Sequence, residues 1–214
     1  MMINSQNDSI GWNTPSSSSS DDYNFVILHG YTEHNDTVFF PWLKSQLEHL
    51  GYKVQLPELP DTDAPLESEQ VEYVINNILF DEKTILIGHS LGGAIAMKTL
   101  EKLPSGIFGL GLAAPGGLEK KFWTEDFEFD RRTGERKQYL AGFDFKYDFT
   151  RITPKFKKCE ILGADNDADY RLPWMKYLSE KLNGQLRLVC ARGFHFTATE
   201  EPEVLKMALD FVKG

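Results

Sequence analysis

The sequence is poor in cysteine and has no long hydrophobic run. Only two cysteines, Cys159 and Cys190, occur in 214 residues, so a disulfide framework of the kind found in small secreted domains is not expected. Each lies in an apolar run typical of a strand, and we expect both to be reduced core residues because free cysteine is usually buried. No stretch approaches the roughly 18 consecutive apolar residues that a membrane-spanning helix needs, so a membrane is not among the expected partners.

Residues 1–22 contain neither Lys nor Arg and lack an apolar segment. They therefore resemble neither a secretory signal nor a transit peptide, and a cytoplasmic location is the default expectation. The segment ends in a run of serines, Ser16–Ser20, followed by two aspartates. Such a composition is too polar to bury a core, and we expect residues 1–22 to form a disordered polar tail.

Positive charge is also scarce. The chain has 23 basic and 32 acidic residues, a net charge of -9, and its basic residues form only short pairs such as Lys120-Lys121 and Lys157-Lys158. A nucleic-acid partner is not expected because this charge repels a phosphate backbone. The length favours a single domain over residues 23–214.

Strand-like and helix-like segments alternate along this domain. We expect strands at Asn24–Leu28, Tyr52–Leu56, Thr84–Ile87, Ile107–Ala113, Cys159–Leu162 and Leu186–Cys190. Helical spacing of apolar residues is found between them, at residues 41–50, 69–79, 92–103, 172–182 and 202–212. This order predicts an α/β fold, a three-layer α/β/α sandwich with a mainly parallel sheet of about six strands. Functional residues are then expected at the carboxyl ends of the strands.

Residues 116–150 interrupt the alternation with an insertion rich in aromatic and charged residues. Within it, Phe127–Asp130 alternates as an exposed strand does, and Arg132–Glu135 is suited to turn that strand back into a hairpin. The insertion follows the fourth expected strand directly, which puts it over the carboxyl edge of the sheet. Two interpretations stay open, a decorated surface loop and a lid that forms part of a substrate pocket.

The stretch TILIGHSLGG, residues 84–93, contains the pattern G-x-S-x-G centred on Ser90. In this pattern a serine occupies a sharp, strained turn between a strand and a helix. Gly88 and Gly92 remove side chains that would clash in such a turn. Because an apolar run precedes the pattern and an Ala-rich helix follows it, we expect Ser90 to be a nucleophile.

A serine nucleophile needs a base and a group that orients the base. Among the five histidines, only His195 follows a late strand at the carboxyl edge, and it is the expected base. The loop after the fifth strand offers three alternating aspartates, Asp165, Asp167 and Asp169. The same alternation is found in calcium loops, but the glycine and the distal acid of an EF-hand are missing here, so no metal site is expected. The order Ser, Asp, His is that of the α/β-hydrolases.

Several short motifs together resemble a known family, the small serine hydrolases of the retinoblastoma-binding protein 9 type within the α/β-hydrolase superfamily. The resemblance runs from about Tyr23 to the C-terminus. It rests on the motifs LHGY (28–31), FPWL (40–43), GYKV (51–54), LP (59–60), GHSLGG (88–93), LAAP (112–115), LP (172–173) and FHF (194–196). In that family the acid lies four residues before a proline, which implies Asp169 in this chain, with Asp167 and Asp165 as alternatives. The pocket-protein motif L-x-C-x-E is missing, because the nearest match, Leu188–Arg192, ends in Arg.

These observations predict a serine hydrolase that cleaves a small ester, thioester or activated amide through an acyl-enzyme intermediate. The small-molecule acyl substrate would be attacked by Ser90, with no cofactor. The backbone N–H groups of Leu91 and Tyr31 are the expected oxyanion hole, and His29 and His89 are expected to border the substrate pocket. Two alternatives stay open: a catalytically weak protein of this fold that acts as a binding module, and the same triad performing acyl transfer to an alcohol or a lyase reaction.

Overall fold

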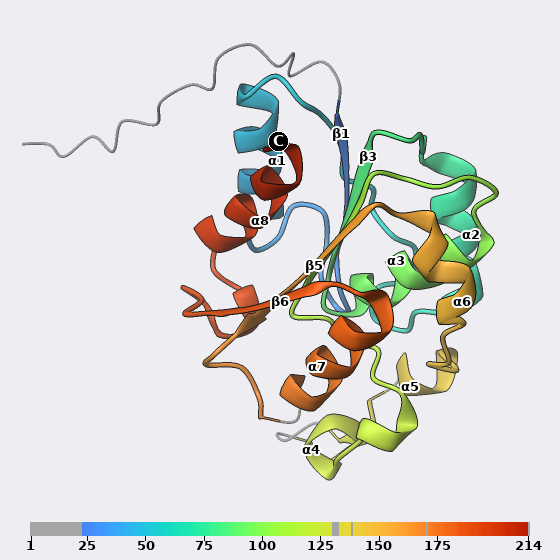
Figure 1. Ribbon diagram of the computed structural model, residues 1–214. Coiled ribbons are helices and arrows are strands. Elements are labelled where there is room, and N and C mark those ends of the chain that lie inside the picture. Colours follow the sequence, from blue (N-terminus) through green and yellow to red (C-terminus); the bar gives the residue numbers. More distant parts are fainter. Residues whose placement is uncertain (1–22, 130–132, 138, 170, 214) are drawn as a thin grey trace, which may run out of the picture.

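A computed structural model describes residues 23–129, 133–137, 139–169 and 171–213. The tail predicted for residues 1–22 lies outside this part of the chain. The described residues contain a six-stranded parallel sheet in the order β2-β1-β3-β4-β5-β6 (Figure 1). Its strands are β1 (Asn24–Leu28), β2 (Lys53–Gln55), β3 (Thr84–His89), β4 (Gly109–Ala113), β5 (Lys158–Ala164) and β6 (Gln185–Val189).

Helices cover both faces of the sheet (Figure 1). On one face lie α1 (Phe40–His49) and α8 (Pro202–Val212), which pack against side chains such as Phe25 and Ile27 of β1. On the other face lie α2 (Glu67–Asn77), α3 (Leu91–Lys102) and α7 (Arg171–Leu182), which pack against Val26 and Leu28. Because successive residues of a strand point to opposite faces, a strand covered on both sides must be apolar throughout. The predicted α/β/α sandwich is confirmed.

The central strands place the carboxyl ends of the sheet together. β3 lies between β1 and β4, with Leu28 beside Gly88 and His89 beside Ala113. β5 and β6 follow on the same side of β4, with Ala164 beside Val189. Loops that leave β1, β3, β5 and β6 therefore begin at one edge of the sheet, where parallel α/β folds form their sites.

The insertion forms short helices joined by aromatic packing. They are η2 (Lys120–Phe122), α4 (Glu125–Glu128), α5 (Tyr139–Gly142) and α6 (Phe149–Ile152), and η3 (Thr153–Lys155) connects them to β5. The rings of Trp123 and Phe127 lie 5.6 Å apart, and those of Phe143 and Phe145 stack at 5.2 Å. Phe127, Tyr139, Leu140, Phe143 and Phe145 are buried in the same apolar cluster as α3 and α7. This segment thus extends the core on one face of the sheet.

The hairpin predicted within the insertion is only partly present. Phe127 belongs to α4, and among the described residues of the insertion the strand-like pairing is limited to an isolated antiparallel bridge between Phe129 and Arg136. The side chain of Thr124 accepts a hydrogen bond from the Phe127 N–H, and acidic residues fill the first turn of α4. Both features stabilise a helix start, which explains why the alternating pattern did not produce a strand. Residues 130–132 of the predicted turn lie outside the described part.

Lys98 joins the insertion to α3 through a buried polar cluster. Its side chain is only 9% exposed, and its Nζ lies 3.2 Å from Asp144 and 3.5 Å from Glu67 of α2. Nζ also donates to the backbone carbonyl of Lys146 and lies 5.4 Å from the ring centroid of Tyr147. The charge on Lys98 therefore contacts groups from both α2 and the insertion.

Replacing Lys98 with methionine should destabilise the protein by about 2 kcal/mol, because carboxylates such as Glu67 lose their counter-charge while remaining partly buried. Denaturant unfolding measures this loss, and faster hydrogen exchange at residues 143–149 would locate it in the insertion. Lys102→Met is the matched control, since Lys102 is exposed on the same helix. Equal unfolding free energies for the two variants would contradict this prediction.

Both cysteines are free. Cys159 in β5 is partly buried, and burial raises the pKa of its thiol to about 12. Cys190 is exposed, which corrects the expectation that both are core residues. β6 is an edge strand that ends at Val189, so the next residue lies beyond the covered part of the sheet. Among the described residues, none of the helices combines the length and apolar character that crossing a bilayer requires.

Candidate active site

Ser90 occupies the turn between β3 and α3 in a strained conformation. Its backbone has φ 52° and ψ -122°, a conformation that residues other than glycine rarely adopt. A Cβ atom at Gly88 would lie 2.5 Å from the carbonyl oxygen of Gly92, and one at Gly92 would lie 2.3 Å from that of Leu28. Both glycines are therefore required sterically. This is the geometry that the sequence pattern predicts for a nucleophile elbow.

The loop after β1 runs against this turn. A Cβ atom at Gly30 would lie 2.8 Å from the Cβ of Ser90, so the loop and the turn are in contact there. Tyr31 follows in the same loop, and its ring lies 4.7 Å from that of Tyr139 in the insertion. Leu91 is the first residue of α3, where a backbone N–H has no acceptor within the helix. The structure thus brings the two segments of the predicted oxyanion hole beside Ser90.

His195 lies in η4 (Phe194–Phe196), after β6, in a backbone conformation that is itself unusual. It has φ 58° and ψ 29°, and Phe196 has φ 55°. The buried carboxylate of Glu201 holds this loop by accepting hydrogen bonds from the N–H groups of Gly193 and Ala198, at 2.8 and 3.2 Å. Such contacts offset the cost of a left-handed backbone at a residue that carries a side chain.

The carboxylate that contacts His195 is that of Asp167. Oδ2 of Asp167 lies 2.5 Å from Nδ1 of His195, and the Asp167 side chain is only 2% exposed. A carboxylate in this position fixes the imidazole tautomer with its proton on Nδ1 and leaves Nε2 as the basic atom.

Asp169, which the family resemblance implied, lies elsewhere. Asp169 and Asp165 are both exposed. The chain turns back after β5, with the N–H of Asp167 bonded to the carbonyl of Ala164 at 3.2 Å, and this turn directs the middle aspartate inward. The structure therefore differs from the assignment by spacing to Pro173, because the local turn decides which carboxylate reaches the imidazole.

Arg171 is a second side chain that contacts the carboxylate of Asp167. Its Nε lies 3.2 Å from Oδ1 of Asp167. Burial raises the pKa of the Asp167 carboxyl, but the hydrogen bond from His195 and the charge of Arg171 outweigh burial and hold this pKa below its ordinary value. For His195, burial and the positive charge of Arg171 outweigh the Asp167 hydrogen bond and lower its pKa to about 4. The imidazole is therefore a neutral base at physiological pH.

Nε2 of His195 is buried and has no hydrogen-bond partner among the described residues. The structure thus brings Ser90 and His195 to the same edge of the sheet without a hydrogen bond between them. Such contacts are often long without substrate and shorten in the reacting complex. An unpaired basic nitrogen in a buried position is the atom that a proton acceptor requires.

The rate at which an active-site serine probe labels Ser90 should fall at acid pH with an apparent pKa near 4, the value that burial and Arg171 give His195. Protonating Nε2 removes the base, so the rate should stay constant from neutral pH down to about one pH unit above that value. The pH dependence of labelling by an active-site serine probe measures this limb, with circular dichroism to verify the fold at each pH. An acid limb near 6.5, the ordinary value for His, would contradict the prediction.

His29 and His89 were expected to border the substrate pocket, but the structure buries both side chains. Nε2 of His29 accepts the N–H of Leu59 at 2.9 Å, so its ring is used in fixing that backbone. The ring of His89 lies between the carboxylate of Glu33 and the carbonyl of His195. Both side chains are closed off from solvent, with exposures of 1% for His29 and 0% for His89, so neither borders an open pocket.

Sequence reasoning missed Glu33 and Glu201. Both carboxylates accept backbone N–H groups in the loops that carry the site, Glu33 from Gly30 at 2.6 Å and Glu201 from Gly193. Neither belongs to a motif, and nothing in their local pattern separates them from the other acidic residues of the chain. Their positions follow only from tertiary contacts.

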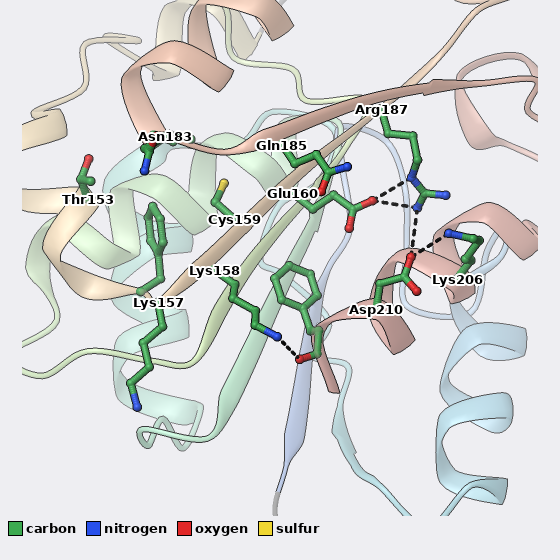
Figure 2. A pocket seen from close by; sticks show the side chains of 13 residues that line it. Thr153, Lys157, Lys158, Cys159, Glu160, Asn183, Gln185, Arg187, Lys206 and Asp210 are labelled. Atoms are coloured by element: carbon green, nitrogen blue, oxygen red, sulfur yellow. Dashed lines mark hydrogen bonds and ion pairs between the residues drawn. The ribbon is translucent and has the colours of Figure 1, made fainter. Parts of the chain in front are cut away.

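A separate pocket of about 580 Å³ lies at the amino ends of β5 and β6 (Figure 2). Its lining mixes polar and apolar residues: Arg187 contacts Glu160 and lies 4.0 Å from Asp210, which also binds Lys206, and Lys158 donates to the carbonyl of Phe211. The pocket includes none of the predicted site residues. In the described part of the chain, no group of three or more His, Cys, Asp or Glu side chains is placed to hold a metal ion.

The parallel sheet, the strained serine after β3 and the histidine after β6 define an α/β-hydrolase. A model of the serine hydrolase family matches residues 25–201, and the chain belongs to that family. It is an enzyme of the hydrolase class, as the sequence motifs predicted.

Individual relatives agree with this assignment. Serine hydrolase RBBP9 of Rattus norvegicus is 25% identical over 186 residues, covering 85% of this chain and 86% of that protein. Putative hydrolase YdeN of Bacillus subtilis is 24% identical over 178 residues, covering 81% of this chain and 86% of that protein. The resemblance to hydrolases of the RBBP9 type is thereby confirmed.

Solved structures show the same fold. The ydeN gene product of B. subtilis has a TM-score of 0.72 at 21% identity, covering 89% of this chain and 98% of that one. Est1E of Butyrivibrio proteoclasticus with bound ferulic acid has a TM-score of 0.70 at 14% identity, covering 94% of this chain and 92% of that one.

Proposed function

We propose that the protein is a carboxylesterase-like serine hydrolase whose triad is Ser90, His195 and Asp167. The observation that carries this proposal is the contact between Nδ1 of His195 and Asp167, at the edge where Ser90 occupies its strained turn. All three residues lie in loops at one edge of the sheet, and they occur along the chain in the order Ser, Asp, His; both facts support the assignment.

The mechanism begins with attack of the Ser90 hydroxyl on an acyl carbonyl, while Nε2 of His195 accepts its proton. Asp167 holds the proton on Nδ1 and stabilises the imidazolium that forms. The imidazolium then gives the proton to the leaving group, and an acyl-enzyme ester remains. Water, deprotonated by the same imidazole, attacks this ester. The acid product is released, and the Ser90 hydroxyl is regenerated.

The backbone N–H groups of Leu91 and Tyr31 are the proposed donors to the tetrahedral oxyanion. The N–H of Gly30 already donates to Glu33 at 2.6 Å, so we propose Tyr31, the next residue of this loop, as the donor. Each donor of this kind typically stabilises the transition state by about 3 to 4 kcal/mol. The chemistry requires no cofactor.

The proposed substrates are small esters, thioesters or activated amides. The insertion is proposed to act as a lid that forms part of the acyl pocket, because its Tyr139 packs on Tyr31 beside Ser90. The name of Est1E's bound ligand, ferulic acid, makes an aromatic acid a reasonable first acyl group for a library. A small-molecule acyl substrate and a cytoplasmic location are part of the same proposal.

Intact-mass labelling with a fluorophosphonate tests this function. We expect one adduct per folded molecule, located on the peptide that contains Ser90. Product analysis with an ester library then separates hydrolysis from acyl transfer to an alcohol, because only hydrolysis releases the free acid stoichiometrically. Folded protein that takes up no probe would overturn the proposal and favour a binding module.

A further inference from the structure

A second histidine-carboxylate pair lies directly beneath the proposed triad. Nδ1 of His89 lies 2.9 Å from Oε2 of Glu33, and Nε2 of His89 lies 2.8 Å from the backbone carbonyl oxygen of His195. The His89 side chain is completely buried and that of Glu33 is 13% exposed. His89 immediately precedes the nucleophile, but none of the steps above uses it.

The partners of His89 determine its protonation. A backbone carbonyl can only accept, so Nε2 must carry a proton. The hydrogen bond at Nδ1 needs a second proton, shared between the imidazole and the Glu33 carboxyl. Imidazole binds a proton more tightly than a carboxylate does, so the ring holds both protons and Glu33 is ionised.

The surroundings favour this ion pair. Burial lowers the pKa of His89, but the charge and the hydrogen bond of Glu33 outweigh burial, and the His89 pKa is raised overall. Burial raises the pKa of Glu33, but the charge and hydrogen bond of His89 and the N–H of Gly30 lower it overall. The other charged groups that act on His89 are Arg171 and, when protonated, His195, and the rings of Phe39 and Phe40 fill the remaining sides.

The pair also joins the two loops that the reaction depends on. Oε2 of Glu33 accepts the N–H of Gly30, which touches Ser90 and precedes the proposed oxyanion donor. At its other end, His89 holds the carbonyl of His195, a residue in a strained left-handed conformation. The rings of His89 and His195 are 5.1 Å apart, so a cation on the first opposes a cation on the second.

We propose that Glu33 and a doubly protonated His89 are a positioning pair for the proposed hydrolase reaction. The pair fixes the loop that carries Gly30 and the backbone of His195, and its cation adds to the effects of burial and Arg171 that keep the imidazole of His195 neutral. The proposal rests on the proposed function for its kinetic consequence, but the protonation of His89 is independent of it.

The first test is ¹⁵N NMR of the imidazole rings in the whole protein, with His89→Asn used to assign the signals. We expect both ring nitrogens of His89 to be protonated at pH 7, and one of them to lose its proton in Glu33→Gln. A neutral His89 ring in the wild-type protein would overturn the proposal. This readout requires no turnover, so it separates failure of the pair from failure of the hydrolase assignment.

The second test is the rate of fluorophosphonate labelling across pH. His89→Asn should slow labelling by about tenfold to a hundredfold, the range that loss of a charge-assisted hydrogen bond supports. The acid limb should also move to higher pH, because the cation that opposes protonation of His195 is gone and Glu33 is left unpaired. A purely structural contact would lower the rate without moving the limb, and an unmoved limb would overturn the proposal.

Glu33→Gln serves as the second variant if His89→Asn does not fold, since it keeps the side-chain shape. It should slow labelling to a similar extent. The matched control is Glu58→Gln, which removes an exposed carboxylate that contacts His34 at 2.6 Å and accepts the N–H of Asn35 at 2.9 Å. The control should label within about twofold of wild type. Equal rates for Glu33→Gln and Glu58→Gln would overturn the proposal.

Discussion

Replacing Ser90 with alanine should abolish fluorophosphonate labelling and lower turnover by at least ~10⁴-fold. In the proposed mechanism the hydroxyl oxygen of Ser90 forms the acyl-enzyme ester, and alanine has no group that can replace it. Alanine keeps the Cβ that packs against Gly30, so the turn and the folded state should persist. Intact mass spectrometry and the thermal unfolding midpoint, measured on the same sample, distinguish loss of the nucleophile from loss of the fold.

The matched control is Ser179→Ala. Ser179 lies on α7 and donates to the carbonyl of Gly184 at 2.6 Å, so its hydroxyl is used in a local structural contact. This variant should label like the wild-type protein. An adduct that persists in Ser90→Ala, or that disappears in Ser179→Ala, would contradict the assignment of the nucleophile.

Replacing Asp167 with asparagine should lower the labelling rate by ~10³ to 10⁴-fold. Asparagine has nearly the same shape, but its amide does not stabilise an imidazolium, and its NH₂ group favours the wrong imidazole tautomer. The 2% exposure of Asp167 and its 2.5 Å contact with His195 mean that water cannot take over this role. The second-order labelling rate at pH 7 is the measurement.

Asp169→Asn is the competing variant, because spacing to Pro173 implies Asp169 and the structure leaves it exposed. If geometry identifies the acid correctly, Asp169→Asn should label at a rate within about threefold of wild type. A large loss in Asp169→Asn together with a small one in Asp167→Asn would instead support the assignment from family spacing.

The strands and helices of the core could be predicted from sequence because each depends on local pattern. The apolar run of β1 and the helical spacing before Gly51 both reflect burial that the tertiary structure then provides. The elbow was predictable because its motif is local, and Gly88 is required by contact with Gly92 within that turn, whereas the contact that requires Gly92 comes from the carbonyl of Leu28 at the end of β1. The insertion was not, because Thr124 capping favoured a helix where alternation favoured a strand.

The triad acid and the Glu33 pair depend on contacts between distant segments. Three aspartates alternate in one loop, and the turn that contains the hydrogen bond from the Asp167 N–H to the Ala164 carbonyl places the Asp167 carboxylate against His195. Glu33 and His89 are separated by 56 positions along the chain, and a single sequence contains no signal that joins them. The family spacing points to Asp169 instead, because a spacing rule takes no account of the local turn in the loop that carries the residue.

The order of the strands has a consequence for the nascent chain. Ser90 follows β3, whereas Asp167 follows β5 and His195 follows β6. On a ribosome, Ser90 therefore emerges long before His195, and under the proposed mechanism its hydroxyl remains an unactivated alcohol until β6 has joined the edge of the sheet beside β5. Covalent capture of this serine would accordingly report completion of the sheet during synthesis, and incomplete chains would not consume acyl compounds.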